Sequence, residues 1–104
     1  MSRVRTGGEG DTAADLELRA LEKMTAALCR HIELLLRSAT ESGALGREAE
    51  LHRQAFEERR KEAMRLVKTP GSEPIATRIA RLERLIEELE VSRTYFKSLV
   101  GGAR

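Results

Sequence analysis

The chain has 104 residues, of which 35% are charged, 40% are hydrophobic and only 3% are aromatic. Its length suits a single domain, and its formal net charge of +2 is lower than dedicated nucleic-acid-binding domains usually carry. Ala, Leu, Glu and Arg at helical spacing are typical of long helices, and the β-branched runs that mark strands are almost absent. We therefore expect an all-α protein with a thin core that other copies or a partner complete.

The single cysteine, Cys29, excludes an internal disulfide and is compatible with a reducing cytoplasm. The N-terminus lacks the apolar core of a signal peptide, and no apolar run approaches the roughly 20 residues that span a bilayer. We expect a cytoplasmic protein with no membrane partner.

Residues 1–10 are rich in glycine and charge and have no periodicity, which predicts a disordered arm. A single helical domain is expected over residues 11–100, followed by a flexible tail at 101–104. The first helix is predicted at about 11–42, with Asp11 or Thr12 as its cap.

The apolar face of this first helix widens near its end, where Leu34 and Leu36 flank Leu35. A helix that is apolar on more than one side usually packs against more than one neighbour. Gly43 follows the last periodic residue, as glycine commonly does past a helix C-terminus.

The second helix is predicted at about 47–68 and has a thin apolar stripe, because residues 57–62 are all charged. That charged run indicates a solvated face with pairs between neighbouring turns. Pro70-Gly71 predicts a turn, and the third helix is expected at about 73–99. The short connection predicts that helices two and three form an antiparallel, coiled-coil-like hairpin.

The third helix has the clearest pattern in the chain. Apolar residues recur at alternating spacings of four and three, as in a coiled-coil seam, and Arg93 interrupts this seam. Helix two cannot cover the seam completely, so Leu85, Leu89 and Leu99 should meet helix one or another copy. We predict an oligomer whose interface includes Leu28, Ile32, Leu35, Leu36, Ile79, Leu82, Leu85, Ile86, Leu89, Phe96 and Leu99.

Basic residues concentrate in helix two and the start of helix three. One copy would bind phosphates weakly, whereas a ring of copies would multiply the same patch. The alternative is that these cations are solubilising charges paired with neighbouring glutamates. The candidate DNA contacts are Arg53, Arg59, Arg60, Lys61, Arg65, Lys68, Arg78 and Arg81.

Candidate metal ligands or catalytic groups are few. Cys29 and His31 point about 200° apart on a helix, and His52 stands alone. A metal or redox bundle would rest only on these three residues, and no nucleophile triad or phosphate-binding glycine motif is present. We expect no enzymatic activity, no metal and no cofactor.

Two segments, PIATRIAR at 74–81 and LIEELEVSR at 85–93, follow a charged helix and a turn. Over about residues 50–98, the chain resembles the C-terminal helical part of phage-type terminase small subunits. The resemblance implies an oligomeric DNA-packaging adaptor that presents DNA to a large terminase subunit. That family commonly has an N-terminal helix-turn-helix domain, which is not evident here, so the implied binding to double-stranded DNA is nonspecific.

The leading hypothesis is thus a non-enzymatic oligomeric adaptor of the terminase small-subunit kind. The alternative hypothesis is a helical chaperone or regulatory protein that clasps a helix of a partner protein.

Overall fold

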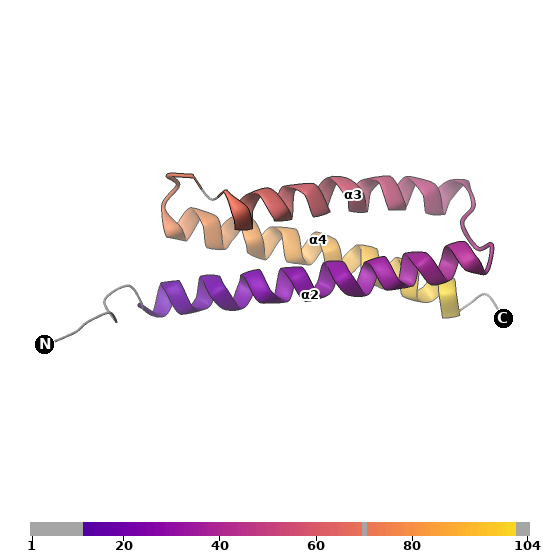
Figure 1. Cartoon of the computed structure of the whole chain (residues 1–104), viewed down its shortest axis with the longest axis horizontal. Helices are drawn as coiled ribbons and strands as arrows, with labels where there is room; N and C mark the ends of the chain where they lie inside the picture. Colours follow the sequence, from indigo (N-terminus) through magenta and orange to yellow (C-terminus); the bar gives the residue numbers. More distant parts are fainter. Residues whose placement is uncertain (1–11, 70, 102–104) are drawn as a thin grey trace, which may run out of the picture.

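The computed structural model describes residues 12–69 and 71–101, which form three α-helices (Figure 1). α2 spans Ala13–Glu41, α3 spans Arg47–Lys68 and α4 spans Ile75–Gly101. No strand occurs in these two segments, so the all-α prediction is confirmed for them. The arm predicted at 1–10 lies outside the described residues, as does the predicted tail beyond Gly101.

α2 begins at a capping box. The hydroxyl of Thr12 accepts a hydrogen bond from the backbone N–H of Asp15 at 3.2 Å, and the Asp15 carboxylate accepts one from the backbone N–H of Thr12 at 3.2 Å. Thr12 is therefore the cap among the two predicted candidates. The helix ends before Gly43, whose φ of 74° reverses the chain at little steric cost.

α4 begins at Ile75, two residues later than predicted. The carbonyl of Pro74 accepts the backbone N–H of Arg78 at 3.1 Å, which is the first bond of the helical ladder. A residue that precedes proline is disfavoured in the helical region, so Glu73 stays outside the helix. Gly71, with a φ of 73°, forms the turn between α3 and α4.

The chain reverses direction at each connection, so α2 and α4 run the same way with α3 opposed to them (Figure 1). α4 packs more extensively against α2 than against α3, and α2 and α3 contact each other least. The prediction favoured α3 as the main neighbour of α4. The charged middle of α3 offers less apolar surface than α2 does, and a coiled-coil geometry in the α3–α4 hairpin stays a prediction.

The core runs along the bundle between all three helices. The side chains that are nearly or fully enclosed come from each helix: Ile32 from α2, Phe56 from α3, and Leu82, Leu89 and Phe96 from α4. Each such side chain contributes about 1.5–3 kcal/mol when it leaves water. The core is therefore shared by the three helices rather than by one hairpin.

Aromatic packing closes the end of the bundle where α3 begins and α4 ends. The His52 ring stacks on the Tyr95 ring, with centroids 3.7 Å apart and planes 11° apart. The Phe96 ring lies nearly perpendicular to both of these rings. This cluster anchors the first turns of α3, which carry few other large apolar side chains.

Ion pairs connect the helices on the outside. Arg59 of α3 donates to Glu88 of α4 at 3.1 Å, and Arg78 of α4 lies 3.8 Å from Glu22 of α2. These side chains are one-fifth to two-fifths exposed, so each pair contributes about 1 kcal/mol at most. No described helix is long and apolar enough to cross a membrane.

Candidate interaction surfaces

The predicted interface residues lie in the core of a single chain. Eight of them are buried, and the other three, Leu35, Ile79 and Leu99, pack against that core while partly exposed. α2 covers the part of the α4 stripe that α3 leaves open, so burial of these side chains requires no second copy. Their role between copies stays a prediction. The eight buried residues are Leu28, Ile32, Leu36, Leu82, Leu85, Ile86, Leu89 and Phe96.

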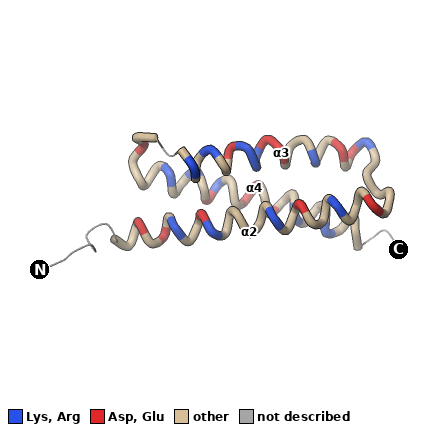
Figure 2. Tube along the Cα trace, viewed as in Figure 1, with Lys and Arg blue, Asp and Glu red and all other residues tan. Residues whose placement is uncertain are grey.

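Five of the eight candidate DNA contacts are engaged in ion pairs. Their partners are glutamates on the same or a neighbouring element: Arg53 pairs with Glu50, Arg59 with Glu88, Arg60 with Glu57 and Glu33, Arg78 with Glu22, and Arg81 with Glu73. Acidic and basic residues are interspersed along the helices (Figure 2). The hydrogen bond from Arg53 lowers the pKa of the Glu50 carboxyl, which keeps that pair charged. Engaged guanidinium groups are poorer phosphate ligands than free ones.

The other three candidates are Lys61, Arg65 and Lys68, all exposed on the second half of α3. No ion pair holds them within the described part of the chain. They form a small cationic surface on the outside of the bundle.

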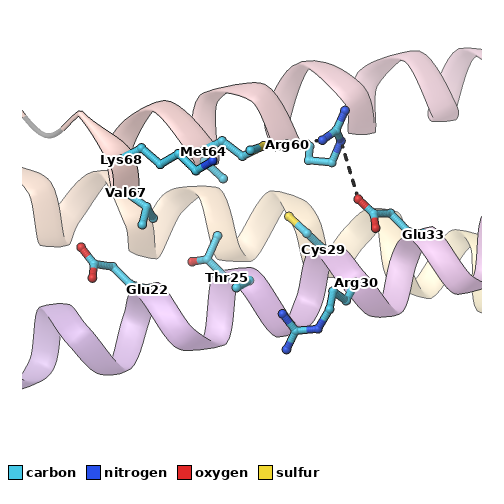
Figure 3. Close-up of a pocket in the computed structure, with 11 residues that line it drawn as sticks. Glu22, Thr25, Cys29, Arg30, Glu33, Arg60, Met64, Val67 and Lys68 are labelled. Atoms are coloured by element: carbon cyan, nitrogen blue, oxygen red, sulfur yellow. Dashed lines mark hydrogen bonds and ion pairs between the residues drawn. The ribbon is translucent and has the colours of Figure 1, made fainter.

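A groove runs between α2 and α3, the pair of helices with the least mutual contact. We call it the α2–α3 groove; its volume is about 320 Å³ and its surface is mostly apolar. Figure 3 shows that the residues around it come from facing sides of the two helices. The residues that supply this apolar surface are Thr25, Ala26, Cys29, Ala63, Met64 and Val67.

Thr25 and Cys29 form the floor of this groove. Thr25 is buried and its hydroxyl donates to the Leu21 carbonyl at 2.7 Å, so it presents its methyl group to the groove. Burial raises the pKa of the Cys29 thiol, the nearby Glu33 carboxylate raises it further, and Arg60 opposes both. Cys29 is therefore a neutral, apolar floor residue rather than a reactive thiolate.

The opposite side of α2 carries a second apolar surface. We call it the outer face of α2; it consists of Ala20, Met24, Ala27, His31 and Leu34, all exposed. Met24 is 51% exposed and Leu34 is 58% exposed. A hollow of about 300 Å³ lies where this face meets Ile86, Glu90 and Arg93 of α4.

The spacing of apolar residues in the sequence already carries a signal for this outer face. Its five residues recur at spacings of four, three, four and three, as seam positions do. This pattern is hard to recognise for two reasons. The core stripe of the same helix has larger Leu and Ile side chains, and two of the five seam positions are alanine. Leu34, which widens the apolar face predicted for the first helix, belongs to this outer face.

The structure does not bring the candidate metal ligands together. Cys29 faces α3, His31 lies exposed on the outer face of α2, and His52 stacks on Tyr95. Among the described residues, no three His, Cys, Asp or Glu side chains are grouped so that they could hold a metal ion.

Comparison of the chain with protein-family models, with curated proteins and with solved structures found no match.

Proposed function

We propose that this protein is a non-enzymatic oligomeric adaptor whose copies associate through the outer face of α2. The observation that carries the proposal is a coiled-coil-spaced apolar seam left in solvent by the folded chain, with Met24 and Leu34 more than half exposed. Exposed apolar seams of this kind are typical of surfaces that bind another helix.

The seam is complementary to itself in an antiparallel arrangement. Two α2 helices centred between Thr25 and Ala26 place Met24 opposite Ala27 of the second copy, and Ala20 opposite His31. Large side chains thus meet small ones in every central layer, which allows close interdigitation. The exposed stretch from Ala20 to Leu34 is 15 residues long, about 21 Å along the helix at 1.5 Å per residue.

The test is gel filtration with light scattering on the full chain and two neighbouring variants. Ala27→Glu places a carboxylate in the centre of the seam, whereas Ala26→Glu places the same group, at the same helix-propensity cost, outside it. We expect the wild-type chain and Ala26→Glu to associate and Ala27→Glu to be monomeric. A monomeric wild-type chain at high concentration, or identical masses for the two variants, contradicts the proposal.

A DNA-packaging adaptor of the terminase small-subunit kind is the second candidate. What favours it is the exposed cationic surface of Lys61, Arg65 and Lys68, which association would multiply. If all three contact phosphates, the logarithm of the affinity should fall with the logarithm of salt with a slope of about −3 per copy. Gel retardation of duplex DNA over a salt series measures it, with the three residues changed to alanine as the comparison. Absence of binding at low salt removes this candidate.

A further inference from the structure

The α2–α3 groove is a separate surface from the one that joins copies. It lies on a different side of α2 from the seam, since Ala26 lines the groove and Ala27 lies on the outer face. Small residues on both helices make it open: Thr25, Ala26 and Cys29 on α2 face Ala63 on α3. A three-helix bundle that is open along one seam offers the position of a fourth helix.

Apolar side chains at the mouth of the groove remain in solvent. Met64 is 42% exposed and Val67 is 38% exposed, and both lie on the α3 wall (Figure 3). Met is flexible and polarizable, so it adapts to partner side chains of different shape. The stretch of α2 from Glu22 to Glu33 lines the groove over 12 residues, about 17 Å or three helical turns.

The charges around the groove favour an anionic partner. Both carboxylates of its rim already have cationic neighbours: Glu22 lies 3.8 Å from Arg78, and Glu33 lies 3.8 Å from Arg60. Arg30 on the α2 wall and Lys68 on the α3 wall are exposed, and no ion pair holds them within the described residues.

Two further lysines lie on the same helix faces as Arg30 and Lys68. Lys23 lies seven residues before Arg30, and Lys61 lies seven residues before Lys68, so each pair shares one face of its helix. Both lysines are exposed. They do not line the groove itself, so each of its walls presents one cation outside the printed ion pairs, Arg30 on α2 and Lys68 on α3, beside an apolar floor.

From this juxtaposition we propose that the α2–α3 groove binds an acidic amphipathic helix of a partner protein. The helix has apolar residues at i, i+4, i+7 and i+11 and carboxylates along both sides of that stripe. A second copy's α2 fits poorly, because Lys23 and Arg30 flank its seam with the same sign of charge. DNA supplies the negative charge but no apolar surface for the floor. The proposal extends the proposed function by naming what the adaptor recruits.

The experiment uses a synthetic helical peptide of this pattern, with leucines at the stripe and glutamates beside it, labelled with a fluorophore. A second peptide has every glutamate replaced by lysine and is otherwise identical. Fluorescence anisotropy during titration with the full-length chain reports binding. We expect the acidic peptide to bind at least tenfold more tightly than the basic one.

Four variants locate the binding site. Ala26→Glu, in the groove, should weaken binding of the acidic peptide at least tenfold, whereas Ala27→Glu should leave it unchanged while abolishing association of copies. Arg30→Glu and Lys68→Glu together should reverse the preference toward the basic peptide. Circular dichroism melting confirms that each variant is folded.

Two results overturn the inference. Equal affinity of the acidic peptide for the wild-type chain and Ala26→Glu, or no binding of that peptide at all, shows that the groove does not take an acidic helix. A loss of mass in Ala26→Glu, measured by light scattering, shows that a second copy occupies it instead. Association of copies is measured on the same samples, so failure of the groove and failure of the outer-face seam are recorded separately.

Discussion

At the scale of single residues, neighbouring alanines in α2 have opposite environments. Ala26 lines the α2–α3 groove and Ala27 lies on the outer face, and both are exposed. Residue type does not separate them, because a small apolar residue is compatible with a core, a groove or a solvent-facing position; only the spacing of Ala27 from Met24 and His31 does. Their assignment depends on the rotation of α2, which the large residues Ile32 and Leu36 fix by packing inward.

Cys29 provides a prediction about reactivity. Because burial and Glu33 raise the pKa of its thiol, the thiolate that reacts with alkylating reagents is scarce in the folded chain. We expect iodoacetamide to label the folded chain at pH 8 far more slowly than the chain in urea, as measured by mass spectrometry. Equal rates in both conditions would show that the thiol is open to solvent.

The raised pKa of the Cys29 thiol predicts the direction in which stability changes with pH. A raised pKa in the folded chain leaves stability unchanged while both states are protonated, at and below neutral pH. As the pH rises past the ordinary thiol range, the unfolded chain loses its proton first and stability falls. The fall in the urea midpoint between pH 7 and pH 10 should be smaller in Cys29→Ala than in the wild-type chain.

At the scale of elements, helix existence and most helix ends could be predicted from the sequence. The structure places α2 and α3 within two residues of their predicted ends, because capping residues and glycines determine them locally. α4 also lies within two residues of its predicted bounds, and Pro74 explains why it begins at Ile75. The dominance of the α2–α4 pairing was not predicted, because α3 is the neighbour of α4 along the chain. The larger apolar surface of α2 outweighs this adjacency.

Substitution of Gly43 tests whether the turn between α2 and α3 requires glycine. Its φ of 74° suits glycine, and a Cβ there would meet nothing within 4 Å, so Gly43→Ala introduces backbone strain alone. We expect it to lower the free energy of unfolding by about 1 kcal/mol, measured by urea denaturation. Gly101→Ala, at the helical end of α4, is the control and should be neutral or stabilising. Equal effects at both sites would contradict a strained turn.

At the scale of the molecule, the stripe of α4 is a core rather than an exposed seam. Leu89 has no exposed surface in the single chain, so Leu89→Ala should lower the free energy of unfolding by about 2–5 kcal/mol at any protein concentration. Val91 is 66% exposed on the same helix, and Val91→Ala should change stability by less than about 0.5 kcal/mol. Loss of association without loss of stability in Leu89→Ala would place this stripe between copies instead.

Association through the outer face makes thermal stability depend on concentration. For a dimer, a tenfold rise in concentration contributes about 0.7 kcal/mol per chain, which corresponds to a rise in Tm of roughly 3–5 °C. The antiparallel arrangement brings Lys23 near Arg30 of the second copy, so added salt should strengthen the dimer, whereas salt weakens any contact with DNA. Calorimetry of the wild-type chain at several concentrations measures the shift, and Ala27→Glu should melt at one temperature throughout. A wild-type Tm that is constant over a hundredfold range of concentration would show that copies do not associate through the outer face of α2.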